Sequence, residues 1–225
     1  MEFQQDERLI GILRNMQRCQ HLRNFAPDNS NSICSGAIYI PENGHAPRAF
    51  GGAKGNLDEV EVVIVNNGPT KPINGEKYSA NPDDDLRLML GDRYIGENAR
   101  SIHPNLKSFL DLLFPEVRDD LYKQLRRVWL TNSVHCTFKE QPRASDRRRC
   151  AIAYLVKEIK LFRNPAVVLA GGKAQSIKCH LVSELENPCI IECHSFSRPF
   201  PKGKQVAVQE WEQAAIACRH HFTTR

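Results

Sequence analysis

The chain has 225 residues, of which 41% are hydrophobic and 25% are charged, and its formal net charge is +5. These values fit a globular protein with one core and are compatible with either an anionic or a neutral partner. No apolar run is long enough to span a bilayer, and the acidic, polar first six residues do not resemble a secretory signal. We therefore expect an intracellular protein, cytoplasmic or nucleoid-associated, that is monomeric and has no membrane partner.

Hydrophobic spacing predicts helices and strands that alternate along the chain. A helix is expected over 6–23, and the following segment to residue 56 is expected to be irregular apart from a short strand at 37–40. The β-branched run at 61–65 predicts a central strand, followed by long loops over 66–101. The later elements expected are a helix at 106–114, a strand at 128–131, a helix at 144–162, a strand at 166–170, a helix at 173–180, a strand at 190–193 and a helix at 205–221.

This order of elements indicates the fold class. Strands that alternate with helices favour a parallel sheet with both faces covered. We predict an α/β protein, a three-layer α/β/α sandwich with a central, mostly parallel four-stranded sheet. We expect a single domain, in which residues 1–56 form an N-terminal helix and irregular segment and residues 57–225 form the α/β core.

Three of the expected strands run directly into polar, turn-prone tips. The tips are Asn66-Asn67-Gly68-Pro69, Asn132-Ser133 and His194-Ser195-Phe196-Ser197. In α/β proteins the ligand crevice lies outside the carboxyl ends of the strands. An Asn amide both donates and accepts, which suits the edge of a pyrimidine base, and a His can donate to an oxygen that becomes negative. Taken singly, each residue has a structural alternative: a turn or cap for Asn, and a core or surface position for His.

Basic residues and cysteines also need an explanation. The basic residues of one segment either bind a phosphate-rich ligand or form a solvated helix face; they are Arg143, Arg147, Arg148, Arg149, Lys157 and Lys160.

The chain has eight cysteines but no CxxC pair, which removes the strongest zinc signature. Disulfides are not expected in a reducing compartment, so metal binding and ordinary burial remain open.

The combination of tips resembles the uracil-DNA glycosylase superfamily. Members have an apolar strand entering a Gly-x-x-Pro loop, a strand ending in a Thr-Asn-Val-Val-Lys-Cys-like segment, and a later His-Pro-Ser-like loop. The counterparts here are Val62-Val63-Ile64-Val65-Asn66-Asn67-Gly68-Pro69, Leu130-Thr131-Asn132-Ser133-Val134-His135-Cys136, and Glu192-Cys193-His194-Ser195-Phe196-Ser197. The stretch from Cys150 to Ala174 also matches, so the resemblance covers roughly residues 60–200.

The resemblance implies a DNA repair enzyme that hydrolyses the N-glycosidic bond of a deaminated base flipped out of single- or double-stranded DNA. Catalysis is then assigned to Asn67, which would position water, and to His194, which would stabilise the departing base. Base binding is assigned to Asn132, Asn66, Gly68 and Tyr94, whose ring would stack on the base; Tyr78 is an alternative. DNA contacts are assigned to Ser195, Phe196, Ser197 and Arg198, with Phe196 either wedged into the base stack or packed beneath its loop.

The sequence departs from the superfamily pattern at the residues that should do chemistry. Asn66 stands where members usually have Gly, and Gly68 stands where some have an Asp or Asn that activates water. Asn67 replaces a Glu or Gln, and a neutral amide is a poor general base. Ser195 replaces the Pro of the His-Pro-Ser loop. The alternative is therefore a weakly active or inactive member that binds nucleic acid or a modified base. A third alternative is an unrelated α/β enzyme of small-molecule metabolism. The sequence contains no Walker or GxGxxG motif that would support it.

The cysteines resemble those of the iron–sulfur class of the superfamily. Cys136 and Cys150 stand where that class has its two later cluster ligands, and Cys19 resembles one of the two early ligands. The second early ligand falls at Leu22, which cannot coordinate, and Cys34 is the expected substitute. Four thiolates would hold a [4Fe–4S] cluster; the alternative is that the cluster is lost and these are buried thiols. The other four cysteines are expected to be core residues.

Overall fold

The sheet of the protein confirms the predicted fold class. The computed structural model describes residues 7–27, 33–47, 57–69, 77, 102–197, 200–201 and 203–224. Its main sheet has four parallel strands in the order β3-β2-β5-β6. The strands are β2 (Val62–Asn66), β3 (Val128–Asn132), β5 (Ala166–Ala170) and β6 (Cys189–Cys193). The first three are buried on both faces, as expected of apolar runs without polar alternation.

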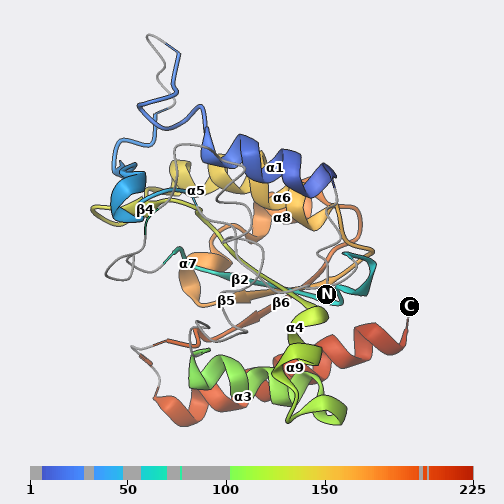
Figure 1. Cartoon of the computed structure of the whole chain (residues 1–225). Helices are drawn as coiled ribbons and strands as arrows, with labels where there is room; N and C mark the ends of the chain where they lie inside the picture. Colours follow the sequence, from blue (N-terminus) through green and yellow to red (C-terminus); the bar gives the residue numbers. More distant parts are fainter. Residues whose placement is uncertain are drawn as a thin grey trace.

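One helical layer covers the face that includes Val63, Val65 and Trp129. Figure 1 shows α1, α5, α6 and α8 on this side of the sheet. The amphipathic spacing of α1 (Glu7–Gln17) buries Leu9, Leu13 and Met16 against it. The other elements of this layer are α5 (Ala144–Cys150), a π-helical turn (Ala151–Leu155), α6 (Val156–Ile159), α7 (Gly172–Gln175) and α8 (Lys178–Glu184).

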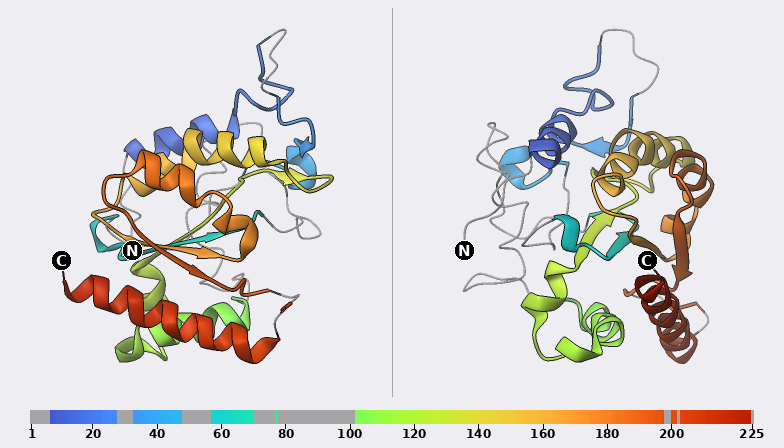
Figure 2. Two further views of the ribbon diagram at one scale, coloured as in Figure 1. Left: turned by 180° about the vertical axis from the view of Figure 1, so that it is seen from behind. Right: turned by 90° about the vertical axis from the view of Figure 1, so that its right-hand side faces the viewer.

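The opposite face carries the second helical layer. Here α3 (Pro104–Leu113), α4 (Leu121–Arg126) and α9 (Lys204–Thr223) lie beneath the sheet, as Figures 1 and 2 show. Val62, Ile64 and Leu130 point into this second core, since alternate residues of a strand face opposite sides. Two separate cores on one sheet make the sandwich three-layered. No helix in the described ranges is both long and apolar enough to cross a membrane.

The structure differs from the predicted elements in several places. The helix expected at 144–162 is interrupted by the π-helical turn after Cys150, and the helix expected at 173–180 is divided into α7 and α8. The short strand at 37–40 is β1 (Ala37–Ile38), and it pairs antiparallel with the unpredicted β4 (Thr137–Phe138). Helix α4 was also missed, because its six residues are too few to show an apolar period.

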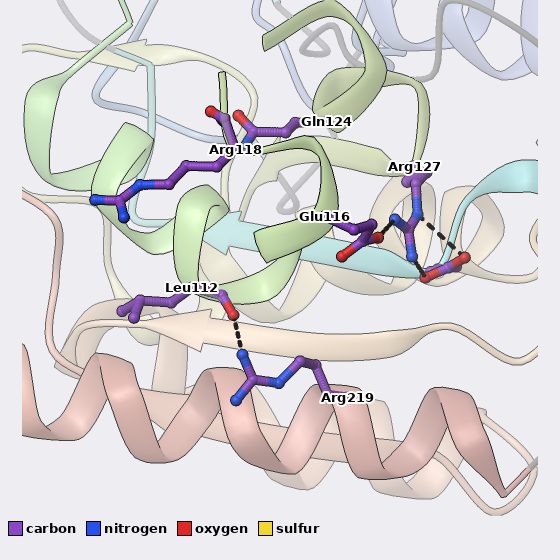
Figure 3. A network of polar contacts seen from close by, with 7 residues as sticks. Leu112, Glu116, Arg118, Gln124, Arg127 and Arg219 are labelled. Atoms are coloured by element: carbon purple, nitrogen blue, oxygen red, sulfur yellow. Dashed lines mark hydrogen bonds and ion pairs between the residues drawn. The ribbon is translucent and has the colours of Figure 1, made fainter. Parts of the chain in front are cut away.

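Ion pairs close the amino edge of the sheet, as Figure 3 shows. Arg127, which precedes β3, binds Glu61 in front of β2 through two hydrogen bonds of 3.2 and 2.8 Å. Arg127 also pairs with Glu116, and its guanidinium lies 4.0 Å from the centre of the Phe114 ring. Burial lowers the pKa of Arg127, but the two carboxylates more than offset it and the net shift is upward. These contacts fix where β2 and β3 begin, and thus the register in which they end.

Candidate functional site

The polar tips of β2 and β3 lie side by side at the carboxyl edge of the sheet. Asn66 is the register partner of Asn132, so the two strands end at the same level. Ser133 then joins the two tips: its N–H donates to the Asn66 carbonyl at 2.8 Å, and its hydroxyl donates to the Asn67 carbonyl. Ser133 is fully buried. The loop after β2 is therefore attached to the segment after β3 by its backbone, which leaves the Asn67 side chain free to serve another purpose.

Two amide groups at these tips are buried without a hydrogen-bond partner in the described part of the chain. They are the Asn132 Nδ2 donor and the Asn67 Oδ1 acceptor. Asn132 is only 2% exposed. A buried polar group without a partner costs about 1–3 kcal/mol, and native proteins rarely retain one without a reason. An unpaired donor and an unpaired acceptor on neighbouring strand ends are what a ligand with a carbonyl and an N–H group needs.

Gly68 is packed closely against the segment that follows β3. A Cβ atom at this position would lie 3.0 Å from Val134 Cγ2, which is closer than ordinary van der Waals contact. The glycine at position 68, where some superfamily members have an Asp or Asn, is thus consistent with the packing here, because an acidic side chain would require Val134 to move. The loop after β2 supplies no carboxylate within its described residues, 66–69.

His194 follows β6 and lies at the same edge of the sheet, two strands away from β2. Its Nδ1 atom is 2.6 Å from Glu210 Oε2 on α9, and its carbonyl accepts a hydrogen bond of 2.8 Å from Trp211 Nε1. Helix α9 therefore holds both the backbone and the ring of this residue. The side chain is 13% exposed, so the imidazole is mostly enclosed.

The residues after His194 take different positions. Phe196 is 4% exposed and packs between Phe109 and Trp211, with ring centres 5.0 and 5.6 Å away. It is thus a core residue here, and inserting it into a base stack would require it to leave these contacts. Ser197 is exposed, and its N–H donates to the hydroxyl of the half-buried Ser195. The expected contacts of Arg198 and the stacking role of Tyr94 or Tyr78 lie outside the described residues.

The four cysteines expected to hold a cluster line a single cavity beside the segment that follows β3. Cys19 comes from the turn after α1, Cys34 from the segment before β1, Cys136 from the segment after β3, and Cys150 from the end of α5. Leu22, at the position of the missing ligand, lines the same cavity. Cys34 reaches it because its N–H bonds to the His21 carbonyl at 2.8 Å, and because β1 pairs with β4 just after Cys136.

The cavity favours neutral thiols as long as nothing positive is bound. Burial raises the pKa of Cys136 well above its usual 9.0, and the other three thiols of the cavity add to this effect. Burial also raises the pKa of Cys150, although its sulfur accepts a hydrogen bond of 3.3 Å from the His135 N–H. Burial and then Asp146 raise the pKa of Cys34 to about 11. Neighbouring thiols oppose the ionisation of Cys34, Cys136 and Cys150, which is the electrostatic condition that a bound cation would relieve.

The four thiols of the cavity have the number and type of ligands that a [4Fe–4S] cluster takes. No group of three His, Cys, Asp or Glu side chains in the described ranges is arranged to hold one ion. A single ion draws its ligands to about 2.3 Å from one point, whereas a [4Fe–4S] cluster takes one thiolate on each iron. Four thiols around one cavity are the number and type that such a cluster requires.

Comparison with known proteins identifies the family. Residues 53–220 match the family model of the uracil DNA glycosylase superfamily, which is well over half of the chain. The chain belongs to the uracil DNA glycosylase superfamily. No curated protein matches the chain. Membership in this superfamily implies glycosylase-like work on DNA, and the matched region contains the tips of β2, β3 and β6 together with Cys136 and Cys150.

Within this superfamily member, the roles of three polar residues were not predicted from the sequence, although Ser133 was named as part of a strand tip. Ser133 attaches the loop after β2, Glu210 binds His194, and Glu158 lies fully buried beneath β3. One oxygen of Glu158 accepts from Trp129 Nε1 at 2.9 Å and from Thr131 Oγ1 at 2.8 Å. Their partners are distant in the sequence, so spacing alone could not reveal Glu210 or Glu158. Ser133 could have been found, because it directly follows Asn132 in a strand tip.

The basic segment of the glycosylase fold is divided between internal and exposed positions. Arg147 is buried and donates to the Pro142 carbonyl, and Arg149 pairs with Asp146 at 2.6 Å. Arg143 and Arg148 are exposed. Lys157 and Lys160 are also exposed, farther along on α6 and just after it. Arg147 and Arg149 thus make contacts around the start of α5, whereas the exposed members lie on a solvated face. A phosphate-rich ligand for the exposed members stays a prediction.

Proposed function

We propose that the protein is a DNA N-glycosylase that hydrolyses the N-glycosidic bond of a deaminated base flipped out of DNA. The observation that carries this proposal is a pair of buried amide atoms, Asn132 Nδ2 and Asn67 Oδ1, that have no hydrogen-bond partner among the described residues and lie at adjoining strand ends. A uracil-like edge offers a carbonyl to the donor. Its N–H, or a water molecule beside it, can be held by the acceptor. Binding such a base would recover the cost of burying both groups.

The remaining residues of the edge take roles consistent with this reaction. Asn132 binds the base, Asn67 orients water near the sugar, and His194 acts from the tip of β6 at the same edge of the sheet. Asn66 and Gly68 shape the loop through their backbone, which Ser133 holds in place. The exposed residues Arg143 and Arg148 contact phosphates beside the flipped nucleotide. Such contacts add affinity without sequence preference.

Base release from defined oligonucleotides tests the proposal. Single- and double-stranded DNA with one uracil, hypoxanthine or xanthine is incubated with excess protein, and the abasic product is measured after alkaline cleavage. We expect release from at least one substrate and a loss of about 10²–10⁴-fold in rate for Asn132→Ala and His194→Ala. Asn43→Ala and His220→Ala, at exposed positions, serve as matched controls and should keep the wild-type rate. Absence of release from all three bases would refute the activity.

A second candidate is a member that binds a modified base without cleaving it. The close contact between Gly68 and Val134 favours this candidate, because an acidic side chain at position 68 would require Val134 to move. It predicts DNA binding that weakens as salt rises, depends on Asn132, and is accompanied by no abasic product. The same oligonucleotides, in a fluorescence anisotropy titration at two salt concentrations, separate this candidate from the enzyme.

We also propose that Cys19, Cys34, Cys136 and Cys150 hold a [4Fe–4S] cluster, with Cys34 in place of the ligand missing at Leu22. When bound, the cluster would join the segments after α1, before β1 and after β3 to the end of α5. The support is the shared cavity and the rise in the pKa of Cys136 that burial and the neighbouring thiols cause. The bound cations would favour the thiolate forms that burial alone disfavours.

Iron and sulfide content tests the cluster. Protein purified without oxygen should be brown and contain about four irons and four sulfides per chain. Cys34→Ser and Cys136→Ser should lower both and remove the visible absorption, whereas Cys179→Ser, at an exposed cysteine outside the cavity, should not. A colourless wild-type protein with no bound iron under these conditions would contradict the proposal.

A further inference from the structure

The contact between His194 and Glu210 limits what the imidazole can do. Within the described part of the chain, Nδ1 is the ring atom that has a hydrogen-bond partner, and the partner is Glu210 Oε2 at 2.6 Å. An ionised carboxylate only accepts hydrogen bonds, so this contact requires the proton on Nδ1. A neutral imidazole carries a single N–H, so Nε2 then has a lone pair. In this tautomer Nε2 is a proton acceptor.

Glu210 is held so that the contact can persist. It lies on α9 next to Trp211, whose indole donates to the carbonyl of His194 itself. Trp211 is 2% exposed and packs against Phe196 in the second core. The backbone of His194 and the carboxylate that faces its ring are therefore fixed by the same turn of one helix. Such support reduces the freedom of the imidazole to rotate.

The described residues of the loop after β2, 67–69, include no group that would activate water. Gly68 has no side chain, a Cβ atom there would press against Val134, and Asn67 offers only a neutral amide. A neutral amide can orient water but is a poor base. By contrast, an imidazole whose Nδ1–H is held by a carboxylate has the arrangement found in general bases, because the carboxylate stabilises the imidazolium that forms.

We infer that His194 and Glu210 form a carboxylate–imidazole dyad in which His194 Nε2 takes a proton from the attacking water and Glu210 is the positioning residue. This inference rests on the proposed glycosylase function and assigns its base. The water oxygen bonds to C1′ of the sugar while the C1′–N bond breaks and its electron pair leaves with the base. The water proton moves to Nε2 and is then given to the departing base, so the imidazole returns to its starting form and one water is consumed.

Nuclear magnetic resonance tests the tautomer independently of activity. The protein is labelled with ¹⁵N-histidine, and the two-bond ¹H–¹⁵N couplings of the imidazole rings are measured. These couplings distinguish a protonated ring nitrogen from one with a lone pair. The signal that disappears in His194→Ala is assigned to His194. We expect the Nδ1–H form in the wild type and in Glu212→Gln, a matched change at an exposed position on the same helix. Glu210→Ala should shift the population toward Nε2–H. An Nε2–H tautomer in the wild type would overturn the dyad.

Single-turnover base release tests the catalytic role. We expect Glu210→Gln to lower the rate by about 10–10³-fold with DNA affinity within about threefold, and Glu212→Gln to match the wild type. If the two residues act as one unit, the His194→Ala, Glu210→Gln double variant should be no slower than His194→Ala alone. A wild-type rate in Glu210→Gln would overturn the dyad and leave the glycosylase function intact. An inactive wild type would overturn the function and the assigned base together, even if the tautomer is as expected.

Discussion

Replacing Asn132 with leucine should make the protein more stable and abolish its function. The Asn132 amide is 2% exposed and its Nδ2 has no partner among the described residues. Leucine has the same branched shape, is somewhat larger and has no polar atoms, so the substitution removes a buried group whose burial costs about 1–3 kcal/mol. Allowing for imperfect packing, we expect a gain of about 1–2 kcal/mol. For a chain of this size, that gain corresponds to a rise in Tm of roughly 2–8 °C.

Asn105 provides the matched control for this substitution. Its Nδ2 donates to the Phe196 carbonyl at 2.7 Å, so it is an amide with a partner. Asn105→Leu should therefore lower the free energy of unfolding by about 1–2 kcal/mol. Both variants are measured by calorimetry and by chemical denaturation, with base release assayed in parallel. If Asn132→Leu lowers the free energy of unfolding as Asn105→Leu does, then Asn132 has a structural partner. The claim that its amide is left unpaired in order to bind a ligand is then refuted.

Three further predictions concern the surroundings of the site. Glu158→Ala should cost about 3–5 kcal/mol in a denaturant titration because it leaves buried donors unpaired, whereas Glu158→Gln should cost about 1–2 because its amide oxygen can still accept. Gly171→Ala should cost about 1–3 kcal/mol and slow base release, since Gly171 has φ +91° and a Cβ there would lie 2.9 Å from Ser195 Cβ; Gly172→Ala, with open space around it, should be nearly neutral. Burial, and then Glu210, raise the pKa of Cys193 from 9.0 to about 12, so its contribution to stability is complete below pH 9 and falls by about 1.4 kcal/mol per pH unit as pH rises toward 12. Cys193→Ala should flatten this alkaline loss, and an unchanged slope of unfolding free energy against pH would contradict the assignment.

The sheet could be predicted from the sequence because its signal is local. Each buried strand is a short apolar run that ends at a polar turn, so β2, β3 and β5 were located within a residue or two. The π-helical turn after Cys150 could not be predicted, because a single extra residue in a helical turn leaves the apolar pattern almost unchanged. The pairing of β1 with β4 joins two-residue strands about a hundred residues apart, and so short a strand has no period.

The site was predicted as a set of residue types, but its contacts were not. Strand tips gave Asn67, Asn132 and His194, because the carboxyl ends of parallel strands share one edge. The partner of His194 lies on a helix whose rotation about its axis depends on packing, so nothing in the local sequence selects Glu210 over Glu212. The wedge role considered for Phe196 illustrates the same limit, since only the tertiary structure shows that its ring packs in the core.

The segment after β3 couples the base-binding edge to the cysteine cavity. Asn132 ends the strand at the carboxyl edge, Ser133 holds the loop after β2, and Cys136 lines the cavity only four residues beyond Asn132. Between them, the His135 N–H donates to Cys150 Sγ, so the backbone is attached to α5 midway. Four residues of extended chain span at most about 14 Å, and here both ends are fixed. A group bound by Cys136 and Cys150 therefore constrains the same backbone that positions Asn132, so losing that group should weaken base binding even though no cysteine contacts the base.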